Sequence, residues 1–202
     1  AQGIETALTT TANPLNVFIM RDGTQAEGQS QVTIEQYQIV RNAPGIARDD
    51  NGEPIAAPEV IAPVNKPRMD GKTANIQVRG IHPNAYLLRP SVRIVEGRAF
   101  RPGLREAIVS RAVANRFRDF KLGDRPRLGR GVFTVVGIFD AQRTAYDSEI
   151  WVDYREAMQE FTRDAYSSVA LRADGTAGVE RIKEFVQSDT RLKLMAKDEV
   201  SY

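Results

Sequence analysis

Few residues in this chain could carry out acid, base or nucleophilic chemistry. His82 is the only histidine, and cysteine is absent. A chain without cysteine forms no disulfide and offers neither a thiol nucleophile nor a thiolate metal ligand. His82 precedes Pro83 at the end of a predicted strand, and one histidine cannot form a histidine pair around a metal. We therefore interpret His82 as a loop residue rather than a general base.

The acidic segment 48–53 (RDDNGE) has the composition of a calcium-binding loop. An EF-hand loop needs carboxylates at its first and last ligand positions, placed around an invariant glycine. If Gly52 is that glycine, Ala47 and Pro58 occupy the two positions, and neither side chain can bind calcium. The segment is better explained as a solvated turn.

Three glycines that lie close together, Gly123, Gly129 and Gly131, do not form a phosphate-binding loop. Such a loop requires a G-x-G-x-x-G or G-K-[ST] pattern that leads from a strand into a helix, and this sequence has neither. We expect these glycines at chain corners. Together the candidates predict no catalytic, cofactor-binding or metal-binding residue and no cofactor, so we do not expect an enzyme.

The strongest charge asymmetry lies in residues 98–130, where nine arginines and Lys121 face only three acidic residues. Three interpretations remain open: a solvated basic face, a contact surface for an acidic protein, and a nucleic-acid patch. A nucleic-acid patch would need aromatic side chains for base stacking. Phe100, Phe117 and Phe120 are available, but their positions suit a core.

The composition describes a soluble globular protein. The chain has 202 residues, of which 42% are hydrophobic and 27% charged, and its formal net charge is +2. This length allows one domain or two small lobes with a buried core. An excess of two charges gives no strong long-range field. No apolar run approaches the roughly 20 residues of a membrane-spanning helix.

Hydrophobic periodicity predicts strands and helices that alternate in the first part of the chain. Thr33 and Gln36 have the spacing of a capping box, which predicts the start of a helix. Asp70-Gly71 predicts a hairpin turn. Strands are expected at 17–20, 59–64 and 73–80. In the last of these, Ile76 and Val78 alternate with polar residues, Arg79 among them, which predicts a sheet with one face in water.

The last third of the chain repeats this pattern. Asp153 and Glu156 have capping-box spacing, and Thr176 is expected to cap a second helix. Trp151, between Ile150 and Val152, is expected in the core. Strands are predicted at 149–152, 168–172 and 192–196.

Residues 106–140 form one supersecondary unit with an unusual internal order. A strand at 107–109 meets Ser110, a good helix N-cap, and a short helix follows with Val113, Ala114 and Phe117 on one side. A Leu-Gly-Asp turn, a short strand at 127–128, the glycine corner and an apolar strand at 133–139 complete the unit. This order resembles the extracytoplasmic domain of MacB-like and FtsX-like ABC transporter permeases.

The resemblance covers most of the chain. Upstream, the segments 75–81 (NIQVRGI) and 95–100 (VEGRAF) are similar to the strand and the approach that precede this unit in the family. Downstream, 146–153 (YDSEIWVD) is similar to the return strand of the same domains.

Pattern and resemblance together predict an α+β fold with two lobes. Strand-helix-strand order at both chain ends indicates one sheet layer built from both termini. The resemblance implies that this layer is a porter-like lobe and that a second lobe is inserted between its halves. The expected boundaries are 1–83 and 146–202 for the discontinuous porter-like lobe, and 84–145 for a small β-rich inserted lobe.

The resemblance also implies a function. The domain would be a non-catalytic periplasmic part of a permease in the bacterial inner membrane, with one membrane helix before Ala1 and three after Tyr202. It would relay ATP-driven conformational change and dock a periplasmic adaptor or substrate. The implied partners are a second permease subunit, a cytoplasmic ABC ATPase and a periplasmic adaptor protein, without nucleic acid. The alternative is a soluble module that binds an anionic ligand or nucleic acid through the arginine-rich inserted lobe.

Overall fold

Residues 12–199 are described in the computed structural model, and they belong to two structural units. Unit 1 contains the chain up to Glu59, the segment Pro83–Leu88 and the chain from Asp164 onward. Unit 2 contains Val60–His82 and Arg89–Arg163. Both units combine strands with helices, which confirms the expected α+β class with two parts.

The units differ in their residues from the two expected lobes. Residues 60–82 and 146–163 belong to unit 2, whereas 84–88 belong to unit 1. Strand pairing explains the difference: β10 (Glu149–Asp153) lies between β4 (Thr73–Ile81) and β6 (Glu106–Ser110) and pairs with both. The segment 146–153 and the strand 73–81 therefore belong to the sheet of unit 2, whereas the sequence prediction built the inserted lobe from residues 84–145 alone.

In unit 1 the strands follow the order β13-β1-β12-β3, and all neighbours are antiparallel. The unit takes only the first residues of β3, up to Glu59. Phe18, Ala57, Leu88 and Ala170 form a buried cluster within it. The elements of unit 1 are β1 (Asn16–Arg21), η1 (Glu27–Gln29), β2 (Val32–Thr33), α2 (Ile34–Val40), the start of β3 (Ala56–Pro67), α3 (Asn84–Leu88), β11 (Ala165–Tyr166), β12 (Ser168–Arg172), α6 (Thr176–Ser188) and β13 (Leu194–Asp198).

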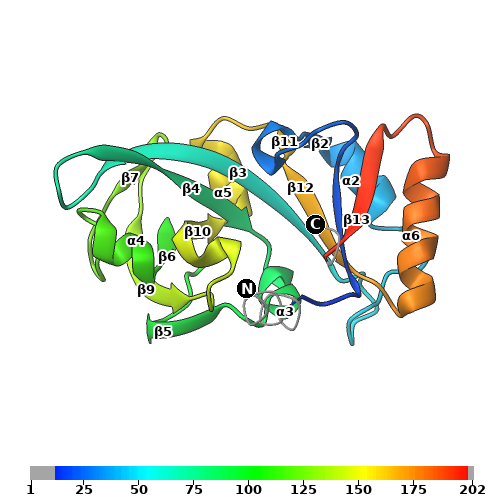
Figure 1. Ribbon diagram of the computed structural model, residues 1–202, viewed down its shortest axis with the longest axis horizontal. Coiled ribbons are helices and arrows are strands. Elements are labelled where there is room, and N and C mark those ends of the chain that lie inside the picture. Colours follow the sequence, from blue (N-terminus) through cyan, green and yellow to red (C-terminus); the bar gives the residue numbers. More distant parts are fainter. Residues whose placement is uncertain (1–11, 200–202) are drawn as a thin grey trace, which may run out of the picture. The chain divides into compact units, whose positions relative to one another are not determined.

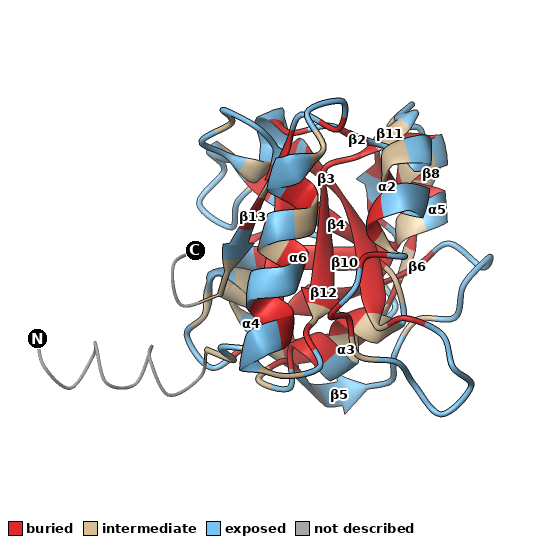
Figure 2. Cartoon of the chain, turned by 90° about the vertical axis from the view of Figure 1, so that its right-hand side faces the viewer, coloured by how far each residue is buried: buried red, intermediate tan, exposed pale blue. Residues whose placement is uncertain are grey.

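The helices of unit 1 begin in different ways. Thr33 and Gln36 make the predicted capping box at α2. The Thr33 hydroxyl accepts from the backbone N–H of Gln36 at 3.0 Å, and the side-chain Oε1 of Gln36 accepts from the backbone N–H of Thr33 at 2.9 Å. The prediction that Thr176 caps α6 is wrong, because the cap position is Gly175, which has no side chain to accept a bond. Packing stabilises α6 instead. The helix lies along β13, and the side chains on one side of it are buried while those on the opposite side are exposed (Figures 1 and 2).

In unit 2 the strands follow the order β3-β4-β10-β6-β9-β5. The β4–β10 and β6–β9 pairs are parallel and the others antiparallel. Trp151 in β10 is fully buried, as expected. The other elements of unit 2 are β5 (Arg93–Gly97), α4 (Arg111–Arg116), β7 (Arg127–Leu128), β8 (Gly131–Val132), β9 (Thr134–Asp140), η2 (Ala145–Ser148) and α5 (Tyr154–Glu160).

A long hairpin of β3 and β4 runs through unit 2 (Figure 1). Its turn is the predicted one, since Gly71 adopts a φ of +90° and the Asp70 carboxylate accepts from the Lys72 amide at 3.0 Å. The tip is tied to the end of α4, where the Met69 amide donates to the Arg116 carbonyl at 2.9 Å. The hairpin and α4 therefore form the two sides of one region.

The segment 106–140 folds as its sequence predicts. The Ser110 hydroxyl accepts from the Val113 amide at 3.2 Å, which confirms Ser110 as the N-cap of α4. Val113, Ala114 and Phe117 are all buried. At the other side of the sheet, β4 approaches α5 so closely that a Cβ on Gly80 would lie 2.6 Å from the Cβ of Ala157.

Candidate functional site

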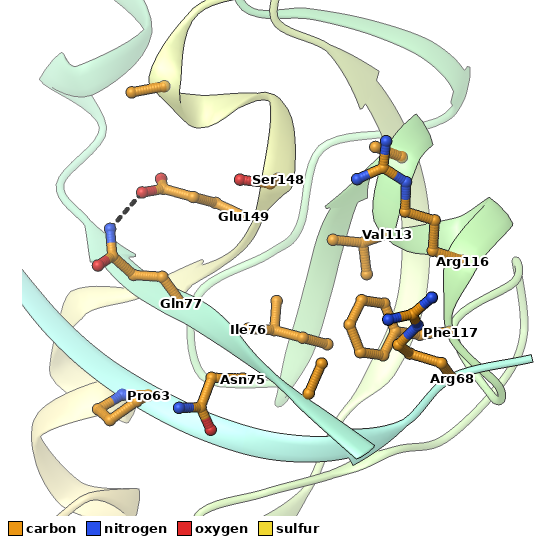
Figure 3. A pocket seen from close by; sticks show the side chains of 13 residues that line it. Pro63, Arg68, Asn75, Ile76, Gln77, Val113, Arg116, Phe117, Ser148 and Glu149 are labelled. Carbon is orange, nitrogen blue, oxygen red and sulfur yellow. Dashed lines mark hydrogen bonds between the residues drawn. The ribbon is translucent and has the colours of Figure 1, made fainter. Parts of the chain in front are cut away.

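A cavity of about 600 Å³ opens in unit 2 between the β3–β4 hairpin, α4 and η2 (Figure 3). Its floor is apolar. Ile76 in β4 contributes to this floor, and Val113 and Phe117 come from the buried side of α4 and its end. These three side chains are almost completely buried in the folded chain.

Two arginines stand beside the Phe117 ring at one end of the cavity (Figure 3). Arg68, at the hairpin tip, pairs with Asp70 at 2.9 Å, and both side chains are half exposed. Arg116, at the end of α4, makes no ion pair through its guanidinium with any residue between 12 and 199. This end of the cavity therefore carries an uncompensated positive charge.

A buried carboxylate, Glu149, lines the cavity away from the arginines (Figure 3). Its Oε1 accepts from Arg79 Nε at 2.8 Å and from Trp151 Nε1 at 2.9 Å. Its Oε2 accepts from Arg79 Nη2 at 3.0 Å and from Gln77 Nε2 at 2.5 Å. The pair of Arg79 and Glu149 is thus bidentate and shielded from water, with side-chain exposures of 4% and 3%.

Parallel pairing of β4 and β10 brings this network together. The register sets Gln77 opposite Glu149 and Arg79 opposite Trp151, so the four side chains share one face of the sheet. The Arg79 guanidinium also lies 5.0 Å from the centre of the Tyr146 ring. Glu149 thus accepts four hydrogen bonds, two on each carboxylate oxygen, and these bonds link β4 with β10.

The prediction for Arg79 is wrong. The alternating pattern of β4 placed Arg79 on a face in water, but the residue is only 3% exposed. The wet face ends at Gln77, because β10 and the Tyr146 ring cover the remainder of the strand. None of the residues of this network was identified from the sequence. Arg79 and Glu149 are 70 residues apart, and only the pairing of their strands makes them partners.

The residues that the sequence analysis considered as possible catalytic, metal-binding or phosphate-binding residues do not line this cavity. His82 follows β4, and its ring contacts Tyr154 with centroids 5.6 Å apart. The acidic segment 48–53 forms an exposed turn, in which the Asp49 carboxylate accepts from the amides of Asn51 and Glu53 at 2.9 and 3.0 Å. Gly129 has a positive φ of +64° at a chain corner. Within residues 12–199 there is no cluster of three or more potential metal ligands.

The arginines of residues 98–130 do not form one uniform patch. Three of the nine pair with carboxylates: Arg98 with Glu106, Arg105 with Glu160, and Arg111 with Asp140 at 4.0 Å. The hydrogen bonds from Arg98, with those from the Arg101 amide, hold the pKa of Glu106 below its ordinary value. Two of the three aromatic side chains behave as expected, since Phe117 and Phe120 are buried in the core, whereas Phe100 is only partly buried.

Some of the remaining arginines gather at a smaller pocket of about 270 Å³. Four basic side chains and two acidic ones line it: Lys66, Arg118, Arg125 and Arg127, with Asp119 and Asp124. Burial, and then repulsion from Arg127, lowers the pKa of Lys66 below its ordinary value. The end of unit 2 around the hairpin tip is therefore basic.

Glu156 does not complete a capping box, which is another departure from the sequence prediction. Asp153 alone caps α5, accepting from the amides of Arg155 and Glu156 at 3.1 and 3.4 Å. The Glu156 carboxylate instead accepts from the Gly103 amide at 2.9 Å. Burial raises the pKa of Glu156 above its ordinary value.

Among residues 12–199 we find no helix with the length and apolar character that a bilayer crossing requires. In comparisons of sequence, the model of the family described as MacB-like periplasmic core domain matches residues 2–188. No curated protein matches at a significant level.

Solved structures with the same fold come from bacterial transporters. The periplasmic region of MacB from Actinobacillus actinomycetemcomitans aligns with a TM-score of 0.68 at 11% identity, covering 95% of this chain and 92% of that one. The extracellular domain of the noncanonic ABC-type transporter YknZ from Gram-positive bacteria gives 0.67 at 15% identity, covering 91% and 100%. A domain of a putative permease from Porphyromonas gingivalis gives 0.57 at 14% identity, covering 91% and 88%.

Proposed function

The chain belongs to the family of MacB-like periplasmic core domains, and from this premise we propose that it relays ATP-driven conformational change and docks a periplasmic adaptor or substrate. It is a periplasmic domain of an ABC transporter permease, and its family is not a class of enzyme. The relay and the docking are the parts that we propose.

The pairing of the first and last described strands carries the proposal. In unit 1, β1 and β13 are antiparallel neighbours, with Val17 opposite Asp198. Glu199 closes the pair: its carboxylate accepts from the Asn13 amide at 2.5 Å, and its amide donates to the Asn16 carbonyl at 3.0 Å. A displacement of the chain on either side of the domain is thereby applied to the same two hydrogen-bonded strands.

Such an arrangement suits a relay. We propose that membrane helices of the permease in the bacterial inner membrane adjoin both ends of the chain and move unit 1 through β1 and β13. The chain crosses between unit 1 and unit 2 at Glu59/Val60, His82/Pro83, Leu88/Arg89 and Arg163/Asp164. We take the two units as the lobes of this relay. A second permease subunit, a cytoplasmic ATPase and a periplasmic adaptor complete the proposed assembly.

The test is a distance measurement in the full-length permease, assembled with its ATPase in liposomes. The chain has no cysteine, so Leu122→Cys, at a position of 44% exposure in unit 2, gives a single labelling site in this domain. The distance between the two labels of a permease pair should change between the ATP-bound and ADP-bound states. A label on Ile34→Cys, 47% exposed in unit 1, provides the matched measurement. An unchanged distance at both positions while ATP is hydrolysed would contradict the relay.

A further inference from the structure

We infer that the cavity of unit 2 is a binding site for an amphipathic anion, which is a molecule with an apolar body and one carboxylate or similar anionic group. The cavity lies entirely within unit 2. Its three properties, which are size, an apolar floor and one uncompensated cation, lead to this class of ligand.

Size and floor define the body of the ligand. A volume of about 600 Å³ falls in the range of small-molecule pockets, roughly 300 to 1,000 Å³. Ile76, Val113 and Phe117 line it with small exposed apolar areas, and Ala74 and Ala112 leave it wide because their side chains are short. A linear or branched hydrocarbon group can displace water from this floor, and the displacement favours binding.

The charges define the head group. Three charged side chains line the cavity, and two of them have partners of opposite charge: Arg68 pairs with Asp70, and the carboxylate of Glu149 pairs with Arg79. Arg116 remains, next to the Phe117 ring (Figure 3). A guanidinium offers a planar set of donors that matches a carboxylate. A cationic ligand would meet Arg116 as a like charge, while the only carboxylate in the lining already accepts four hydrogen bonds.

The polar rim agrees with an elongated ligand. Asn75, Gln77 and Ser148 stand around the opening, where their groups can face water. The anionic group would bind Arg116, and the body would lie over the floor toward Glu149. The inference bears on the proposed function only if this ligand is the transported substrate; the site itself is a property of the chain alone.

The experiment uses the complete chain of 202 residues and three probes with the same hydrocarbon tail, which are decanoate, decanol and decylammonium. Calorimetric titration below micelle-forming concentrations should show saturable binding of one decanoate per chain, weaker binding of decanol and the weakest binding of decylammonium. Arg116→Ala should weaken decanoate binding about tenfold, as expected for the loss of one charge-assisted hydrogen-bonded contact, and leave decanol unchanged. Arg163→Ala is the matched control, because this exposed arginine of unit 2 lines neither cavity.

Ala112→Trp should fill the cavity and abolish binding of both decanoate and decanol. If that variant fails to melt cooperatively, Ala145→Trp at the exposed rim in η2 serves instead. The inference is overturned if decanoate does not bind saturably, if the three probes bind equally, or if Arg163→Ala weakens decanoate as much as Arg116→Ala. Because the assay contains neither membrane nor ATPase, a negative result leaves the relay untouched, and an unchanged label distance in liposomes leaves the binding site untouched.

Discussion

Removal of the Glu149 carboxylate should destabilise unit 2 more than any exposed substitution. Glu149→Ala deletes the acceptor of four hydrogen bonds and removes the carboxylate that pairs with the Arg79 guanidinium, a side chain of only 4% exposure. The pair itself has no large net benefit, since the desolvation of two charges offsets their attraction. The loss of one partner, however, exposes the full desolvation cost of the other.

The magnitude follows from that cost. Breaking a buried ion pair by deleting one partner destabilises a protein by about 3 to 5 kcal/mol. Water can reach Gln77, which is exposed, so its lost bond adds little. The Trp151 Nε1–H is buried and loses its acceptor, which keeps the expected value in the upper part of that range. The double variant Arg79→Met with Glu149→Leu should recover most of the loss, because no charge remains to be desolvated.

Urea unfolding followed by tryptophan fluorescence measures this effect at a probe in unit 2. Trp151 is the only tryptophan, and its ring packs against Phe139 and Tyr146 with centroids 5.2 and 5.9 Å apart. Its fluorescence therefore reports the unfolding of the sheet that contains the pair, while far-ultraviolet circular dichroism reports both units. Glu96→Ala, on the exposed face of β5, is the control and should change stability by at most about 0.5 kcal/mol.

A loss below about 1 kcal/mol for Glu149→Ala would refute the reasoning, because it would mean that water or another acceptor reaches Arg79. A double variant as unstable as the single one would refute it in another way. It would show that the side-chain shapes, and not the unpaired charge, determine stability here.

Three further predictions concern other positions of unit 2. Because burial raises the pKa of Glu156, its contribution to stability is greatest below the ordinary carboxyl pKa of 4.5 and is lost as pH rises through the raised pKa; Glu156→Gln should therefore gain stability relative to the wild type as pH rises, and a constant difference in thermal unfolding would contradict this. Val135→Asp places an unpaired charge at a position of 1% exposure and should abolish cooperative melting of unit 2; melting at an unchanged temperature would show that the position is exposed. Gly80→Ala should cost about 1 to 3 kcal/mol in chemical unfolding because β4 and α5 must separate, whereas Gly28→Ala, with no atom within 4 Å of the new Cβ, should be nearly neutral.

Local patterns were sufficient for most elements. Ser110 and the capping box of Thr33 and Gln36 were predictable because the groups that bond lie three residues apart. The strand at 168–172 was predictable because its apolar run is bounded by polar residues on both sides. The prediction for Thr176 failed because the helix begins one residue earlier than expected. Thr176 is the first residue of α6, and Gly175 occupies the cap position.

The cavity and its network could not be predicted in this way. Arg79 has the same local pattern as Gln77, yet only Arg79 is covered, because the coverage comes from β10 and η2 far along the chain. Glu156 likewise has the spacing of a capping partner, but the Gly103 amide, 53 residues away, competes for its carboxylate. No pattern of neighbouring residues specifies the register between parallel strands. A site that depends on this register therefore cannot be predicted from short sequence patterns.

The pairing of β1 with β13 brings the two ends of the described chain close together, which suits the domain to circular permutation and to insertion into other proteins. Asn13 and Glu199 are hydrogen-bonded neighbours, so a linker of a few glycines could join them, and the chain could be opened at the exposed turn around Gly52 without breaking a strand. Such a circular permutant would keep every strand pair of unit 1. For the same reason, the domain could be inserted into a loop of a host protein if the two loop ends lie little more than the spacing of two strands apart, about 5 Å.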